Sequence, residues 1–249
     1  MHEFESKITT PHGQMDTFIC HPEEEAPHPA VVIYMDAPAI REELRDMARR
    51  IATVGYYVVL PNLYYRHGTE HTYGFDHAKT RQPDGQAHLK RMFELMTSLS
   101  NEKIISDTGP LIEFIRSDNA AKPGPMGCVG YCMSGQYVVS VAAAYSDDYA
   151  AAASFYGVGI LTDAEDSPHL RASEIKGELY LAFAEEDEFV PPEIVRALPA
   201  ELAKSGVKHR IEIYPDTGHG FAFPNRPAYH KVSGERHWER IFALFNRNL

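Results

Sequence analysis

Residues 126–135 read MGCVGYCMSG and join a short apolar run to a turn rich in small residues. The run Met126–Val129 predicts a buried strand, and the apolar spacing over Ser134–Tyr145 predicts a helix directly after it. Cys132 therefore lies in a tight turn between a strand and a helix. This arrangement is typical of a nucleophile elbow of pattern G-x-nucleophile-x-G, with cysteine in the place of the usual serine.

Cys132 has the neighbours that such a turn requires. Strand and helix approach closely only if small residues stand two positions before and two positions after the nucleophile, and Gly130 and Ser134 fill these places. The start of the helix favours a thiolate through its macrodipole and free N–H groups. The N–H of Met133 is expected to point to a developing oxyanion. Taken alone, the motif is also compatible with a buried structural cysteine.

Strand and helix patterns alternate on both sides of this motif. The other expected strands are 3–9, 14–20, Ala30–Tyr34, Tyr56–Leu60, Ala151–Phe155, Leu179–Phe183 and Arg210–Tyr214. The other expected helices are 40–54, 101–117, 191–205 and a last one marked by Trp238, Ile241, Phe242 and Phe245. We expect Pro199 to kink or split the third of these helices. The alternation predicts an α/β fold, with a mostly parallel central sheet and helices on both faces.

Residues 62–100 interrupt the alternation. They are polar and rich in His, Gly and Tyr, and we interpret them as a lid-like excursion over the strand ends. No repeat, linker or change of composition divides the chain. A single domain over residues 1–249 is therefore expected.

Two further polar residues follow later strands. The strand ending near Ala184 leads into an acidic stretch with Asp187, and the strand ending at Tyr214 leads into a turn in which two glycines flank His219. Each signal alone is weak, because acidic loops and loop histidines are usually only solvated. Together with Cys132 they follow the chain order nucleophile, acid, base of the α/β-hydrolases.

On these residues the chain resembles the dienelactone hydrolase family, a carboxymethylenebutenolidase-like group within the α/β-hydrolase fold. The likeness is carried by Gly127–Gly135, Ala184–Pro192 and Tyr214–Phe223. It extends to the order of strands and helices over nearly the whole chain. The resemblance implies Cys132 as nucleophile, Asp187 as acid and His219 as base.

The stretch Tyr34–Ala37 belongs to the same resemblance. The family carries a glutamate after this strand that contacts the resting cysteine, and the adjacent backbone supplies an oxyanion N–H. The resemblance implies these roles for Asp36, which is one methylene shorter, and for Ala37. Ser134 stands where the family usually has glycine.

Substrate recognition departs from the family's pattern. Members that cleave dienelactone bind the substrate carboxylate through arginines, one of them four residues after the catalytic histidine. That position is Phe223 here, and the nearest arginine is Arg226. Arg81 and Arg91 of the lid-like region are candidates for substrate binding instead. We therefore expect a small-molecule ester or lactone related to dienelactone.

We expect aromatic residues to line the substrate pocket. The candidates are Tyr131, Phe221 and Phe223, together with the 34–38 loop and the lid-like region. They suggest a cyclic or apolar acyl group.

The assembled parts predict hydrolysis through a thioester. Cys132 attacks the acyl carbonyl, and the N–H groups of Met133 and Ala37 hold the oxyanion. His219, oriented by Asp187, moves the proton to the leaving alkoxide and later activates water. Because a thiolate is also a good leaving group, activated esters and lactones are expected to react and peptides are not.

The same residues are compatible with functions other than ester hydrolysis. A non-hydrolytic protein of the same fold would use Cys132 as a redox sensor or in a ligand-binding module. His67, His71 and His77 cluster with Glu70 and Asp76, but they lack the H-E-x-x-H order, so no metal site is expected. Residues 157–159 read Gly-Val-Gly and are interpreted as a loop, not a dinucleotide motif; no cofactor is expected.

The composition limits the partners and the cellular compartment that are expected for this protein. With 24 Lys+Arg and 35 Asp+Glu the net charge is −11, which disfavours nucleic acid and anionic membrane surfaces as partners. Three cysteines exclude a disulfide framework and favour a reducing compartment. No secretory signal is visible, so a cytoplasmic location is expected. The oligomeric state is not readable from the sequence.

Overall fold

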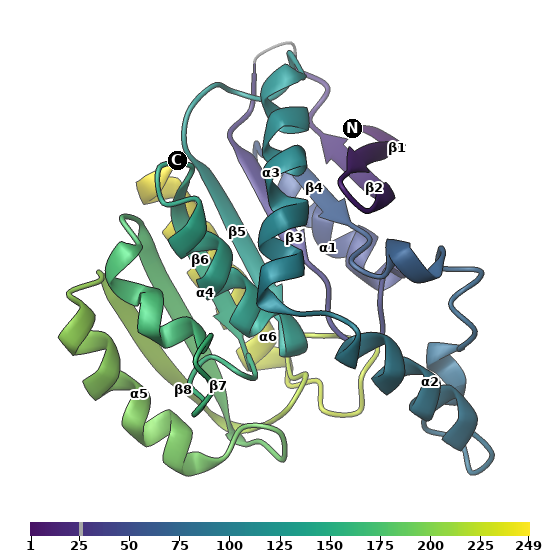
Figure 1. Cartoon of the computed structure of the whole chain (residues 1–249), viewed down its shortest axis with the longest axis vertical. Helices are drawn as coiled ribbons and strands as arrows, with labels where there is room; N and C mark the ends of the chain where they lie inside the picture. Colours follow the sequence, from purple (N-terminus) through teal and green to yellow (C-terminus); the bar gives the residue numbers. More distant parts are fainter. Residues whose placement is uncertain (25–26) are drawn as a thin grey trace.

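Figure 1 shows the computed structural model of the chain, which describes residues 1–24 and 27–249. In this part of the chain one eight-stranded sheet has the order β1-β2-β4-β3-β5-β6-β7-β8. The strands are β1 (His2–Thr10), β2 (Gly13–His21), β3 (Ala30–Tyr34), β4 (Tyr57–Pro61), β5 (Met126–Tyr131), β6 (Tyr149–Phe155), β7 (Glu178–Glu186) and β8 (His209–Gly218). The β1–β2 and β2–β4 pairs are antiparallel, and all the other pairs are parallel. The predicted mostly parallel α/β sheet is confirmed.

Helices cover both faces of the sheet, as predicted (Figure 1). They are α1 (Glu42–Ala52), α2 (Gln86–Thr97), α3 (Asn101–Ser117), α4 (Gly135–Ala144), α5 (Pro192–Ser205) and α6 (Lys231–Asn248). On one face α1 meets α6, where Arg50 pairs with Glu235 at 2.9 Å. On the other face the Tyr145 hydroxyl, just past α4, donates to the Ile105 carbonyl of α3 at 2.7 Å. Over residues 1–24 and 27–249, no helix combines the length and the apolarity needed to cross a bilayer.

The centre of the sheet is buried on both sides. Every residue of β3, β4 and β5 is buried. Their sequences are continuously apolar because both faces of a central parallel strand pack against helices. Each fully buried Val, Leu or Ile contributes about 1.5–3 kcal/mol relative to an exposed one. This rigid centre carries the loop in which Cys132 lies.

The structure differs from the sequence-based expectation at several element bounds. Helix α5 continues through Pro199, so the expected split does not occur. Helix α1 begins at Glu42 and not at residue 40, because Ala39 has a left-handed φ of 69° and closes a turn onto the Asp36 carbonyl. The excursion over residues 62–100 contains α2, a helix that the sequence analysis did not predict.

Candidate active site

The turn after β5 has the geometry of a nucleophile elbow. Cys132 has a φ of 54°, in the left-handed region that non-glycine residues rarely adopt. It opens the short 3₁₀ turn Cys132–Ser134, and α4 follows directly at Gly135. A Cβ atom on Gly130 would lie 2.5 Å from Cγ2 of Val138, so only glycine permits this approach of strand and helix. The Cys132 side chain is held at the start of α4.

Ser134 fits this turn through a hydrogen bond. It is fully buried, its φ is −82°, and its hydroxyl donates to the Met35 carbonyl. Because this φ is ordinary for any residue, the backbone at Ser134 carries no strain from the replacement of glycine. The hydroxyl joins the elbow to the loop after β3, the loop that carries Ala37.

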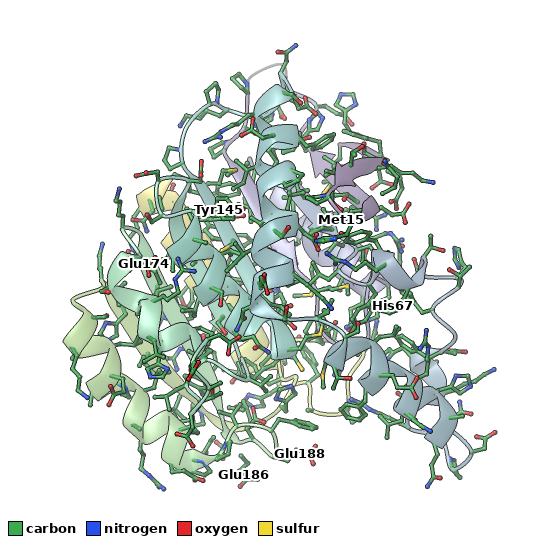
Figure 2. All side chains as sticks on the ribbon, viewed as in Figure 1. Met15, His67, Tyr145, Glu174, Glu186 and Glu188 are labelled. Carbon is green, nitrogen blue, oxygen red and sulfur yellow. The ribbon has the colours of Figure 1, made fainter. Side chains whose placement is uncertain are left out.

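His219 and Asp187 meet after β8 and β7. Nδ1 of His219 lies 2.9 Å from both carboxylate oxygens of Asp187, and Oδ1 of Asp187 also accepts the N–H of Phe189 at 2.9 Å. The two side chains are only 7% and 2% exposed. Figure 2 shows Glu186 and Glu188, the chain neighbours of Asp187, at the lower edge of the molecule. Since Nδ1 is engaged by Asp187, Nε2 is the ring nitrogen left for a reacting thiol.

The surroundings of His219 favour its protonated form. Burial, the largest single influence, lowers the pKa of the imidazole, but the hydrogen bond to Asp187 and the neighbouring Cys132 thiol raise it. The net effect brings the pKa of His219 to about 9, from an ordinary value of 6.5. The ring of Phe189 meets the His219 ring edge to face, with 4.7 Å between ring centroids. These surroundings therefore favour the imidazolium form of His219 beside the Cys132 sulfur.

The two residues expected to form the oxyanion hole are linked through Tyr64. The buried hydroxyl of Tyr64 lies 3.0 Å from the Ala37 carbonyl, to which it donates, and 3.3 Å from the Met133 sulfur. Ala37 lines the same cavity as Cys132, and Met133 follows Cys132 in the turn. Tyr64 was not predictable from the sequence, because it stands just after β4 in a stretch without a recognisable motif.

Cys132 and His219 open into one cavity of about 370 Å³. The cavity is lined by Ala37, Pro38, His77, Thr80, Arg81, Leu89, Met92, Phe93, Met96, Cys132, Val158, Glu188, Phe189, His219 and Arg226. The lid-like region thus does cover the strand ends, and Arg81 reaches the cavity as expected. Four apolar residues of α2 also reach it. Their helical spacing is visible in the sequence, but it was not recognised there.

Three aromatic residues expected in the pocket lie beneath it. Tyr131, Phe221 and Phe223 are completely buried and do not line the cavity. The Tyr131 hydroxyl pairs with Nε2 of His237 at 2.8 Å, and Phe221 stacks on Tyr214 with 4.7 Å between ring centroids. The expectation is corrected for a simple reason: these rings complete the core under the site instead of facing substrate.

Asp36 contacts arginines. Its fully buried carboxylate pairs with Arg41 at 2.6 Å and also with Arg226. Burial alone would raise the pKa of the Asp36 carboxyl, but the two guanidinium groups hold it below its usual value. Among the described residues, no hydrogen bond joins Asp36 to the Cys132 thiol. Both carboxylate oxygens bind arginines instead, so a hydrogen bond to the resting cysteine, by which the resemblance would place Asp36 against it, is not formed.

Arg226 reaches the cavity from an unexpected position. The resemblance expects an arginine at position 223, where Phe223 stands. The Arg41 and Arg226 guanidinium groups lie 4.9 Å and 5.2 Å from the centroid of that ring. Phe223 therefore supports Arg226, whose side chain enters the cavity three residues later in the chain.

Arg91 does not reach the cavity. It donates to the Tyr73 carbonyl at 2.9 Å and pairs with Glu94 on α2. Its expected role in substrate binding is corrected for that reason.

The histidines of the lid-like region do not converge. His77 lines the cavity, whereas His67 pairs with the Ser98 hydroxyl at 3.0 Å. Figure 2 shows His67 well away from Glu188. Across residues 1–24 and 27–249, no group of three or more His, Cys, Asp or Glu side chains has a geometry suited to a metal ion.

Residues 157–159 form a loop after β6, as predicted. A Cβ atom on Gly135 would lie 2.2 Å from the Gly157 Cα, so this loop packs directly against the start of α4. The Val158 N–H donates to the Cys132 carbonyl at 3.0 Å. Gly135 and Gly157 therefore allow the loop and the helix to pack closely beside the elbow.

The sequence is similar to known proteins over most of its length. Residues 15–249 match the sequence profile of the family described as "Dienelactone hydrolase family". A Synechocystis protein named "Putative carboxymethylenebutenolidase" is 27% identical over 239 residues, which cover 95% of this chain and 93% of that protein. An Escherichia coli protein of the same name is 24% identical over 247 residues, which cover 97% and 86%.

The fold also has a close counterpart among solved structures. A Klebsiella pneumoniae crystal structure described as a "Putative Dienelactone Hydrolase" superimposes with a TM-score of 0.83 at 21% identity, over 98% of each chain. This likeness extends the agreement to the whole length of the fold. Since the profile match spans nearly the whole sequence, the chain belongs to the dienelactone hydrolase family and is a hydrolase.

Proposed function

We propose that this protein hydrolyses a small-molecule ester or lactone through Cys132, His219 and Asp187, with a thioester acyl-enzyme as intermediate. One observation carries the proposal. Cys132, in a left-handed turn at the start of a helix, and His219, bound to a buried carboxylate, line the same cavity. Nucleophile, base and orienting acid in this relation are the recognisable parts of triad catalysis. The family to which the chain belongs supports the ester or lactone class.

The first half-reaction forms the thioester. The Cys132 thiolate attacks the acyl carbonyl, and the oxyanion develops toward the N–H groups of Met133 and Ala37. The C–O bond to the leaving group then breaks, and the His219 imidazolium gives its proton to the departing alkoxide. Asp187 stabilises the imidazolium and fixes which ring nitrogen faces the sulfur.

The second half-reaction returns the enzyme to its starting state. Neutral His219 takes a proton from water, and the hydroxide attacks the thioester carbonyl. The C–S bond breaks, and the thiolate leaves as the carboxylic acid forms. Asp36 takes no part in these steps; it holds Arg41 and Arg226 in place.

Cationic side chains at one end of the cavity favour an anionic group on the substrate. Arg81 and Arg226 both line the cavity, and the charges of Arg226 and Arg41 lower the pKa of Arg81, after burial. Arg226 is paired with Asp36, whereas Arg81 forms no ion pair with any of the described residues. A guanidinium without a carboxylate partner attracts a carboxylate or similar anion on the substrate. Arg81→Gln is expected to raise KM for an aryl ester that carries a carboxylate about tenfold and to leave a neutral aryl ester nearly unchanged.

Ester turnover tests the role of Cys132. The rate of 4-nitrophenyl acetate hydrolysis is measured for the wild type, Cys132→Ala and Cys20→Ala. Cys20 is buried on β2 and serves as the matched control. Loss of about three orders of magnitude in Cys132→Ala alone is expected, in line with removal of a triad nucleophile. Full activity of Cys132→Ala would falsify the proposal.

A further inference from the structure

One wall of the cavity is the apolar side of α2. Leu89, Met92, Phe93 and Met96 line it and follow one another at the spacing i, i+3, i+4, i+7. Residues at this spacing share one side of a helix and form a continuous strip. We call these four residues the α2 strip.

The α2 strip is only partly covered by the rest of the protein. Leu95 is completely buried and anchors the helix, and Met92 is 8% exposed. Leu89 and Phe93 stay 37% and 38% exposed. Both also border a shallow depression with Gln86, Ala87 and Lys90. Large apolar side chains that line a cavity and remain accessible to water are typical of surface that a ligand covers. Figure 1 shows α2 projecting from the body of the molecule on the side where the excursion leaves the sheet.

Other apolar groups line the same cavity. Phe189 is 50% exposed and carries its ring next to His219. Val158 and Pro38 come from the loops after β6 and β3. The apolar walls therefore extend from α2 to the catalytic histidine, and a bound group that touches them lies beside the reacting sulfur.

We propose that the substrate of this hydrolase carries an apolar ring or a chain of five or more carbons that lies along the α2 strip. The inference rests on the proposed function and names the substrate class of that site. A cavity of about 370 Å³ is of the size that takes a small organic ligand. Met92 and Met96 have unbranched, adaptable side chains, so the strip accommodates more than one apolar shape.

The first experiment measures kcat/KM for 4-nitrophenyl esters whose acyl chain grows from two to eight carbons. For the wild type, kcat/KM is expected to rise about threefold to fourfold for each added methylene that is buried, until the strip is filled. The variant Leu89→Ser/Phe93→Ser is expected to lose about tenfold or more on the longest ester and less than about twofold on the acetate. Both residues are partly exposed, so the double variant is compatible with the fold.

The matched control removes an exposed leucine elsewhere. Leu170, 57% exposed on the 3₁₀ turn Pro168–Glu174, lies outside the cavity. Leu170→Ser is expected to keep the wild-type dependence on chain length.

A second experiment reads the strip without requiring turnover. N-alkylmaleimides of growing chain length add to a thiol, and their second-order rate of labelling Cys132 is followed by mass spectrometry. The rate is expected to rise with alkyl length in the wild type and to rise less in Leu89→Ser/Phe93→Ser. A rise in either series that the double variant removes supports the inference.

Three outcomes contradict the inference, and they are separable from failure of the proposed function. If neither kcat/KM nor the labelling rate rises with chain length, the substrate does not carry the proposed apolar group. If the double variant keeps the wild-type dependence on chain length, the α2 strip does not bind the apolar group. A wild-type dimer that the double variant dissociates, with both dependences unaltered, assigns the strip to contacts between two copies. By contrast, esters left intact while the maleimide series rises would contradict the hydrolytic mechanism and leave the apolar strip standing.

Discussion

At the scale of single residues, a local motif can be recognised in the sequence, but the partners that a side chain contacts in the fold cannot. Cys132, Asp187 and His219 were predictable because each follows a strand in a recognisable local pattern. The partners of Asp36 were not, because Arg226 comes from 190 residues away in the chain. Likewise, the burial of Phe221 and Phe223 depends on how the turn after β8 directs each side chain, which spacing does not reveal.

The pKa of His219 makes a residue-scale prediction about pH. In the proposed mechanism the protonated ring delivers a proton to the leaving alkoxide, and the pKa of His219 is raised to about 9. kcat/KM is therefore expected to fall as pH rises through about 9. Asp187→Asn removes a charge that stabilises the imidazolium, so it is expected to move this fall to lower pH by about one unit or more.

The matched control for this pH profile is Glu186→Gln, the exposed residue that ends β7 directly before Asp187. It is expected to leave the profile in place. An Asp187→Asn profile that coincides with the wild type would show that the carboxylate does not tune His219.

At the scale of elements, the junction of β5 and α4 is sterically constrained at Gly130. The elbow was predictable because small residues, Gly130 and Ser134, stand two positions before and after Cys132. Helix α2 was missed because its polar flanks and neighbouring glycines masked a real helical spacing. Helix α5 continues through Pro199, because a proline inside a helix costs stability without always ending the helix.

Gly130→Ala tests the junction. The added methyl group would lie 2.5 Å from Cγ2 of Val138 and 2.8 Å from the Ser134 carbonyl oxygen. We expect the free energy of unfolding to fall by about 1–3 kcal/mol, the usual cost of overpacking. Urea unfolding followed by circular dichroism measures this.

Gly218→Ala is the control for that measurement. Its Cβ atom would have only ordinary contacts, the nearest at 3.6 Å, and is expected to change stability by less than about 0.5 kcal/mol. Equal losses in the two variants would contradict the steric account of the elbow.

At the scale of the whole molecule, the site is assembled by the sheet. The loops after β3, β5, β7 and β8 bring together Ala37, Cys132, Asp187 and His219. Parallel strands place their carboxyl ends at one edge, where such folds bind ligands. This arrangement was predictable from the alternation of strands and helices, whereas the shape of the cavity depends on the long excursion, which interrupts that alternation.

We propose that the chain folds as a single domain, because all eight strands share one sheet and one apolar core. Unfolding in urea is expected to be a single transition. The fluorescence of Trp238, the only tryptophan, and the far-UV circular dichroism should give the same midpoint. Two separated midpoints would divide the chain into independent units.

The central claim is that Cys132 carries the acyl group. The most direct measurement is intact-protein mass spectrometry after rapid acid quench of the enzyme mixed with an excess of 4-nitrophenyl ester, followed by peptide mapping. We predict a transient mass increase equal to the acyl group, located on the peptide with Cys132, sensitive to hydroxylamine and absent in Cys132→Ala. Turnover without any acylated Cys132, or an acyl group on another residue, would contradict the account.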